Sequence, residues 1–265
     1  IANPETAVNE VQRGRIDWMQ EPPPPDRYEE LKDRYEGTQF LATPQIDIYY
    51  FWMNVKRAPF DDVRVRRAVN YAIAPEALER IYSGSMRPNQ QVLPPAMPGH
   101  REYRPYPHDM AKAKELIAEA DPKVRKITVW TDDYPPNKQA GEYYEGVLRE
   151  LGFDPTLKVM QSANYTTIIG NESTPNLDTG WANWYLDYPH PNDYFQPQLT
   201  KAGIAPTAGT NWARFDDPAI TRKIEQLDRT PLGPSAEAAY ARLDREVMSQ
   251  APWAPFGSVP TTPFV

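Results

Sequence analysis

The sequence has no cysteine, and this absence removes several kinds of chemistry at once. Without a thiol the chain can form no disulfide bridge, no thiolate metal site and no cysteine nucleophile. Positive charge is scarce relative to negative charge: 29 Lys and Arg against 36 Asp and Glu give a net charge of -7 and a pI of about 5.1. Because nucleic-acid binding depends on clustered basic side chains that release counterions, nucleic acid is not an expected partner.

Long apolar runs are also missing. None approaches the roughly 18 residues that a membrane-spanning helix requires. The first ten residues, "IANPETAVNE", lack the basic and apolar regions of a signal peptide. With 265 residues, the chain is long enough to bury a sizeable core in one large or two modest domains.

Proline, by contrast, is abundant, with 30 prolines in the chain where the usual share is about 5%. Disorder is excluded because 12% of the residues are aromatic and 40% are hydrophobic, which is too much apolar surface for a solvated chain. The prolines gather in "EPPPPD", "LPPAMPG", "YPP" and "YPHP", which are predicted to be stiff loops between folded segments. For "EPPPPD", a polyproline ligand for another module is the alternative.

Apolar periodicity predicts helices alternating with short strands. The predicted helices span residues 4–14, 61–73, 75–84, 109–120, 140–152, 217–229 and 235–250, with Asp61 or Asp62, Asp109 and Asp217 at helix starts and Gly14, Gly84 and Gly152 at helix ends. The predicted strands span residues 15–18, 46–55, 126–130, 156–160 and 253–259. This alternation predicts an α/β fold with helices around a mostly parallel sheet. Trp181 and Trp184 lie three residues apart in "GWANWY", so one is expected to face the core and the other a cleft.

Three arginines in "VRVRRAV" raise the possibility of an anion site. Arg64, Arg66 and Arg67 lie largely off the apolar face of the predicted helix. We therefore interpret them as a solvated face that pairs with acids such as Asp61, Asp62 and Glu76.

The histidines do not form a metal-binding pattern. His100, His108 and His190 are the only three, and none lies three or four residues from another. The sequence therefore predicts neither a metal site nor a cofactor. His190 alone is a candidate for contact with a ligand or a chelated metal.

Six stretches together resemble one known family: "TAVNEVQRGRIDW", "PFDDVRVRRAVNYAI", "YPHDMAKAKELIAEA", "GVLRELGF", "WYLDYPHP" and "APWAPF". Their order and spacing are similar to those of the extracellular solute-binding proteins of family 5, the receptors of oligopeptide, dipeptide and nickel ABC importers. The resemblance implies two α/β lobes joined by a hinge, with the ligand enclosed between them. The expected fold class is a periplasmic binding protein type II-like lobe, with a mixed sheet flanked by helices.

The resemblance also implies that this chain is a fragment comprising mainly lobe II. Residues 1–48 would be a remnant of lobe I, residues 49–252 the ligand-binding lobe II, and residues 253–265 a return strand toward lobe I. Hinge residues are expected near the two crossings between lobes. A fragment of this kind is expected to bind ligand poorly, because half of the cleft wall would be absent.

The same resemblance points to Asp187 in "WYLDYPHPNDYF" as a ligand-binding residue. Peptide-binding relatives use the aspartate of a W-x-x-D-Y segment to hold the N-terminal amine of the ligand, and Trp184 and Asp187 occupy these positions here. Tyr185, Tyr188 and His190 are further candidates, and aromatic rings beside an ammonium add cation–π attraction. The alternative is that Asp187 accepts an Asx-type hydrogen bond in the turn before Pro189 or Pro191.

The expected function is that of the substrate-binding component of an ABC importer, which binds peptides or a similar small solute and delivers it to a membrane permease. The protein would be a monomer, located in the periplasm or outside the cell, and membrane-anchored if a lipoprotein signal precedes the sequence. A receptor for a sugar, opine or metal chelate is the alternative, as is a ligand-sensing or chaperone-like role without transport.

An enzyme is the rival class. The sequence has no Gly-x-Ser-x-Gly elbow and no HExxH motif, so it is not expected to be an enzyme. A carboxylate-based hydrolase that uses Asp132, Asp133, Asp187 and Asp193 stays open as a minor alternative.

Overall fold

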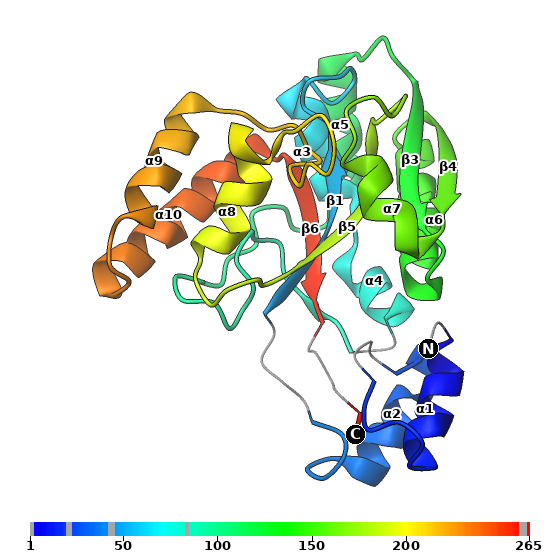
Figure 1. The fold of residues 1–265 in the computed structure, drawn as a ribbon. Helices are drawn as coiled ribbons and strands as arrows, with labels where there is room; N and C mark the ends of the chain where they lie inside the picture. The colour runs from blue at the N-terminus through cyan, green and yellow to red at the C-terminus, as the bar shows by residue number, and fades with distance from the viewer. Residues whose placement is uncertain (1–2, 20–22, 42–45, 83–84, 260–263) are drawn as a thin grey trace.

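The computed structural model describes residues 3–19, 23–41, 46–82, 85–259 and 264–265. Its helices are α1 (Pro4–Gln12), α2 (Pro25–Tyr35), α3 (Val63–Ala72), α4 (Pro75–Ile81), α5 (Met110–Ala120), α6 (Pro135–Glu150), α7 (Ser162–Ile169), α8 (Asn192–Leu199), α9 (Pro218–Asp228) and α10 (Pro234–Gln250), with a 3-10 turn η1 (Lys201–Gly203). Its strands are β1 (Asp47–Met53), β2 (Arg87–Pro88), β3 (Lys126–Asp132), β4 (Asp154–Met160), β5 (Thr179–Tyr185) and β6 (Trp253–Ser258) (Figure 1). None of the described helices is long and apolar enough to cross a bilayer.

The described strands form one mixed sheet in the order β2-β6-β1-β5-β3-β4. β3 runs parallel to both β4 and β5, whereas β1 pairs antiparallel with β5 and β6, and β2 pairs antiparallel with β6. The prediction of a mostly parallel sheet is therefore wrong, and the mixed sheet of the expected fold class is confirmed. The difference arises at β1, which is buried along its whole length between β6 and β5 and pairs antiparallel with both.

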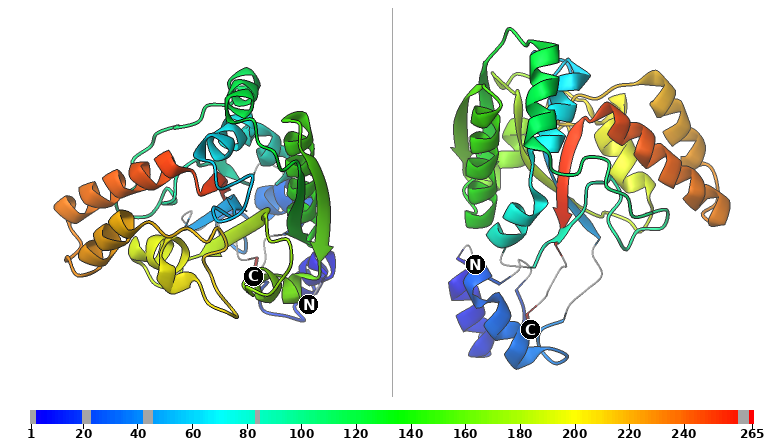
Figure 2. Two further views of the ribbon diagram at one scale, coloured as in Figure 1. Left: turned by 90° about the horizontal axis from the view of Figure 1, so that it is seen from above. Right: turned by 180° about the vertical axis from the view of Figure 1, so that it is seen from behind.

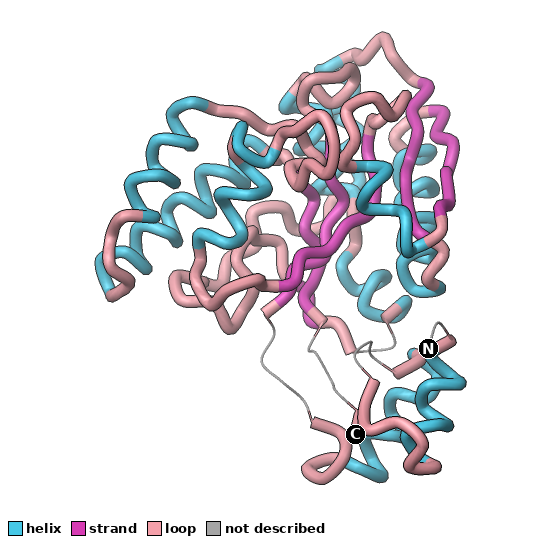
Figure 3. Tube along the Cα trace, viewed as in Figure 1, coloured by secondary structure: helices cyan, strands magenta, loops and turns pink. Residues whose placement is uncertain are grey.

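Helices cover the sheet in two groups (Figures 1 and 2). Helix α6 packs on β3 and β4, and α3 packs on β6 and on α5. Helices α8, α9 and α10 pack together in a separate group. The tube in Figure 3 shows long loops between them. The stretches "LPPAMPG" and "YPHP" lie in loops as predicted, whereas Pro135 and Pro136 of "YPP" begin α6. One large buried cluster unites the sheet with these helices.

A second, separate buried cluster joins α1 and α2. It contains Ala7, Val8, Val11, Met19, Tyr28, Leu31, Phe40 and Phe264. We call residues 3–41 with Phe264 and Val265 the N-terminal unit, and residues 46–259 the sheet unit; Figure 1 shows the first below the lower ends of β1 and β6. The lobe boundaries at residues 48 and 252 stay a prediction.

Three of the predicted helix starts are confirmed in detail, whereas the helix predicted from residue 140 begins at Pro135. The side chains of Asp62, Asp109 and Asp217 each lie at the N-cap of a helix and accept hydrogen bonds from backbone N–H groups of the first turn. Gly152 ends α6 with a positive φ of 86°, as the C′ position requires. Gly84 lies outside the described residues.

Two predictions around the N-terminal unit are wrong. Residues 15–18 form turns and bends rather than a strand, and only Met19 bridges to Phe264. The stretch "EPPPPD" is not wholly a loop, because α2 begins at Pro25, a position where the missing N–H of proline costs nothing. Residues 20–22, including the start of that stretch, lie outside the described residues.

The prediction of a solvated arginine face is confirmed for only one of the three arginines. Arg64 pairs with Asp62 at 2.6 Å, as expected. Arg66 is instead buried, and its guanidinium donates to the carbonyl oxygens of Gln250 and Phe60. Arg67 donates to the carbonyl of Ser249, so two arginines of α3 satisfy the last carbonyls of α10.

The strands that lead toward the N-terminal unit are tied together at Asp47. Its carboxylate accepts a hydrogen bond from the N–H of Val259 at 2.8 Å, and its carbonyl accepts one from the hydroxyl of Ser258 at 2.7 Å. Burial raises the pKa of Asp47 to about 8. β1 and β6 are thereby joined at the point where both leave the sheet.

Candidate ligand-binding groove

Two neighbouring depressions lie where the N-terminal unit faces the sheet unit. The smaller is lined by Pro23, Tyr28, Tyr49, Tyr82, Ser85, Tyr134, Pro136, Asn137, Asn183, Tyr185 and Val259. The larger has a volume of about 870 Å³ and shares Tyr134, Asn137, Asn183 and Tyr185 with the smaller one. We call the two together the groove. Because both units supply residues to its walls, a molecule in the groove would contact both.

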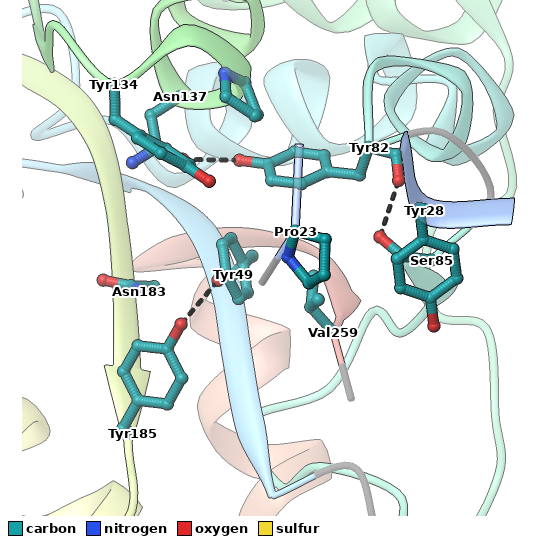
Figure 4. A pocket seen from close by; sticks show the side chains of 11 residues that line it. Pro23, Tyr28, Tyr49, Tyr82, Ser85, Tyr134, Asn137, Asn183, Tyr185 and Val259 are labelled. Carbon is teal, nitrogen blue, oxygen red and sulfur yellow. Dashed lines mark hydrogen bonds between the residues drawn. The ribbon is translucent and has the colours of Figure 1, made fainter. Parts of the chain in front are cut away.

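The wall of the smaller depression is built from phenol and amide groups that hold one another in place (Figure 4). The hydroxyls of Tyr49 and Tyr185 lie 2.9 Å apart, and the hydroxyl of Tyr82 donates to the amide oxygen of Asn137 at 3.0 Å. The indole N–H of Trp181 donates to the hydroxyl of Tyr82 at 3.1 Å. These bonds come from β1, β5, the end of α4 and the start of α6, so the wall is preorganised by elements of the sheet unit.

Strand β5 supplies one wall of the larger depression. Trp181, Asn183 and Tyr185 alternate along the strand and line the larger depression, and Ala182 between the first two lines it as well. Trp184 does not line it, although its ring is 6.4 Å from that of Trp212, which does. Trp181 is both buried and part of the groove wall. The expected division, with one tryptophan facing the core and the other facing the cleft, is therefore not what the structure has.

The carboxyl end of β3 brings two acidic residues into the larger depression. Asp132 is 6% exposed and accepts hydrogen bonds from the N–H of Tyr134 and the side-chain amide of Asn137 at the start of α6. Asp133 accepts two hydrogen bonds from Ser162, one from its N–H and one from its hydroxyl. These bonds from Ser162 lower the pKa of Asp133 below its ordinary value, so its carboxylate is charged at neutral pH.

The loop after β5 is organised by Asp193 rather than by Asp187. Asp193 is 1% exposed, and its Oδ2 accepts hydrogen bonds from the indole N–H of Trp184 at 3.1 Å and the backbone N–H of Asp187 at 3.0 Å. Burial raises its pKa above the ordinary range, partly offset by these two bonds. Asp193 thereby ties the end of β5 and the start of the loop to the first turn of α8.

The structure places the predicted ligand-binding residues at different depths. Tyr185 lines both depressions. Asp187 and Tyr188 are exposed in the loop and line neither depression, and the Asp187 side chain makes no hydrogen bond within the described residues. His190 is half-buried: its ring lies against Tyr240, and its Nδ1 accepts from the N–H of Asn192 at 3.2 Å. The Asx-type turn bond expected as the alternative role of Asp187 is absent from the described part of the chain.

The geometry does not assemble the four carboxylates considered for a hydrolase. Asp132 and Asp133 line the groove, whereas Asp187 and Asp193 do not. No three His, Asp or Glu side chains of the described residues are arranged to hold a metal ion.

Several groove residues were not anticipated from the sequence: Tyr49, Tyr82, Tyr134, Asn137 and Asn183. Asn183 and Tyr185 share the period-two face of "GWANWY", so that pattern would have revealed them. Tyr49 and Tyr82 come from segments that read as apolar core, and no local signal distinguishes a core tyrosine from one whose hydroxyl reaches a groove.

Comparison with known proteins agrees with this architecture of a mixed sheet flanked by helices. Residues 1–206 match the family model of the bacterial extracellular solute-binding proteins, family 5 Middle. The chain therefore belongs to the family 5 extracellular solute-binding proteins.

Relatives are similar over most of this chain. Heme-binding protein A of Haemophilus influenzae is 28% identical over 86% of the chain, which covers 43% of that protein. The glutathione-binding protein GsiB of Escherichia coli strain K12 is 24% identical over 96% of the chain and 50% of its own length. The chain thus spans about half the length of the curated relatives it matches.

Solved structures share the fold. The periplasmic binding protein DppA of Helicobacter pylori, in complex with the peptide STSA, superposes with a TM-score of 0.86 at 21% identity over 100% of this chain and 51% of DppA. A dipeptide-binding protein from Pseudoalteromonas, in complex with Met-Leu, gives a TM-score of 0.84 at 22% identity over 99% of this chain and 52% of that protein. These matches confirm the expected fold class.

Proposed function

We propose that the protein is part of the substrate-binding component of an ABC importer, which binds peptides or a similar small solute between two lobes and delivers it to a membrane permease. The observation that carries the proposal is the groove, whose larger depression has walls from both units: Trp18 and Met19 from one side, Asp132 and Tyr185 from the other. A ligand that contacts both units favours the arrangement in which they are close together. The free energy available to signal to the permease is then limited to the ligand's preference for that closed form.

Membership of a binding-protein family supports a receptor that performs no chemistry. We propose that it acts as a monomer in the periplasm or outside the cell, anchored to the membrane where a lipoprotein signal is present. Relatives named for heme, glutathione and dipeptides make peptides the first ligand class to test and hemin the second.

Asp187 remains the proposed anchor for the ligand's N-terminal ammonium. Its carboxylate is exposed and has no hydrogen-bond partner within the described residues, and it follows a strand whose residues line the groove. A charge-assisted bond to an ammonium would be strengthened when closure excludes water. Trp184, Tyr188 and His190 would then shape the loop that carries it.

The test is thermal unfolding of the full-length protein with a pool of di- to pentapeptides, with the same pool N-acetylated, and with hemin. A ligand at 100 times its Kd stabilises a protein by about 2.7 kcal/mol, which raises Tm by several degrees. We expect a rise with free-amine peptides that is lost on acetylation and in Asp187→Asn, but kept in the exposed control Asp154→Asn. A rise with hemin alone would make the protein a receptor for a non-peptide solute, and a rise that survives both acetylation and Asp187→Asn would remove Asp187 from the site.

A further inference from the structure

The charges that line the groove have one sign. Asp132 and Asp133 are the charged side chains among the described residues that line its two depressions, and neither lysine nor arginine lines them. Aromatic rings flank the carboxylates: Tyr134 follows them directly in the chain, and Trp18, 54% exposed, lies across the same depression. Carboxylate and aromatic ring together are the environment that a lysine or arginine side chain prefers.

Of the two carboxylates, Asp133 is the one with an oxygen that can still accept a hydrogen bond from a ligand. Asp132 is buried and accepts bonds with both oxygens from the start of α6. In Asp133 both bonds from Ser162 go to Oδ1, so within the described residues Oδ2 accepts no hydrogen bond, and the side chain is exposed.

A second, independent feature of the same depression is a buried hydrogen-bond donor without an acceptor. Trp212 lines it and is 6% exposed, yet its indole N–H has no hydrogen-bond partner within the described residues. Buried donors in proteins are almost always paired.

This carboxylate is separate from the proposed amine anchor. Asp133 follows the end of β3 and lines the larger depression, whereas Asp187 lies in the loop after β5 and lines neither depression.

We propose that the groove contains a second subsite, in which Asp133 pairs with a cationic side chain of the ligand while the indole of Trp212 donates to a ligand carbonyl. The protein then prefers peptides that carry lysine or arginine after the first residue. This inference rests on the proposed function of the same groove.

The test measures, by calorimetry on the full-length protein, the affinities of tetrapeptides with a free amine that carry lysine, norleucine or glutamate at the second, third or fourth position. Norleucine keeps the aliphatic stem of lysine and lacks the charge. At one position we expect lysine to bind about tenfold more tightly than norleucine and glutamate to bind most weakly, with the lysine preference decreasing as salt is raised.

Asp133→Asn is the diagnostic variant, because asparagine keeps an oxygen for the two bonds from Ser162 and removes the charge. We expect its ratio of lysine to norleucine affinity to fall to near one. The matched control is Asp109→Asn, an exposed aspartate at the N-cap of α5, which lies outside the groove and whose ratio should match the wild type. Trp212→Phe should weaken lysine and norleucine peptides by the same factor and leave their ratio unchanged.

The outcomes separate the two proposals. Tetrapeptides that bind with no preference for lysine, or a preference that survives Asp133→Asn, would overturn the subsite and leave the peptide receptor standing. Failure of every tetrapeptide to bind would overturn the peptide receptor and the subsite together. Unchanged affinities in Trp212→Phe would remove the indole from the subsite without touching the role of Asp133.

Discussion

The indole N–H of Trp184 donates to the buried carboxylate of Asp193, 3.1 Å away, and this bond closes the ten residues from Trp184 to Asp193 into a loop. The same oxygen of Asp193 accepts the N–H of Asp187. The loop that carries the proposed amine anchor is therefore held from inside the protein by a residue that a ligand does not reach.

Replacing Asp193 with alanine should destabilise the protein by about 1–3 kcal/mol, because two donors lose their acceptor in a buried place. Urea unfolding measures the change. Glu225→Ala on the exposed face of α9 is the control and should unfold at the wild-type urea concentration. An Asp193→Ala protein as stable as the wild type would show that the loop does not depend on these bonds.

The stability of the protein should fall as pH rises toward 7 and 8. Burial raises the pKa of Asp244 to about 7, although the N–H groups of Leu93 and Val92 oppose the shift, and burial raises that of Asp47 to about 8. Between pH ~4 and these pKa values the folded state therefore binds more protons than the unfolded state. The free energy of unfolding that the two protonated carboxyl groups contribute is fully present below pH ~4 and is lost as the pH rises through the two folded-state pKa values.

Urea unfolding between pH 5 and 9 measures this dependence, and Asp244→Asn should flatten the part between pH 5 and 7. Asn carries no titrating proton, so this comparison isolates Asp244 from the other acids. A slope in Asp244→Asn equal to that of the wild type would contradict the assignment.

The buried arginine of α3 should matter far more than its exposed neighbour. Arg66→Ala leaves the carbonyls of Gln250 and Phe60 without donors and removes a buried stem, so we expect a loss of about 2–4 kcal/mol in the free energy of unfolding. Arg64→Ala on the same helix removes a solvent-exposed pair with Asp62 and should change the unfolding midpoint little. Equal effects of the two substitutions in thermal or urea unfolding would refute the distinction.

Two glycines should respond to alanine in opposite directions. A Cβ at Gly203 would lie 1.7 Å from the carbonyl oxygen of Pro197, so the backbone must move and Gly203→Ala should destabilise the protein. Gly146 lies within α6 with open space around its Cα, and Gly146→Ala should stabilise by about 0.5–1 kcal/mol, since alanine is the better helix former. Thermal unfolding of the two variants in parallel checks the signs.

Local signals in the sequence were sufficient for most elements. Aspartates before apolar-periodic segments mark the starts of α3, α5 and α9, because an N-cap needs only a short polar side chain and the next turn. The same reasoning missed α7, α8 and α2 among the helices and β2 and β5 among the strands. Pro197 lies inside α8, and proline-rich sequence precedes α2. Because proline usually marks a turn or the end of a helix, neither segment was predicted to be helical.

The amino-acid sequence by itself determined the α/β class, the absence of thiol chemistry and the positions of most helices and strands, because these depend on composition and on contacts between near neighbours in the chain. Only the tertiary structure decided that the central pairings are antiparallel, that Arg66 is buried, and that Tyr49, Asp133 and Tyr185 share one groove. Most of those features bring together residues that are more than a hundred positions apart in the chain. A contact between distant segments does not change the periodicity of either segment, so it cannot be predicted from local sequence patterns.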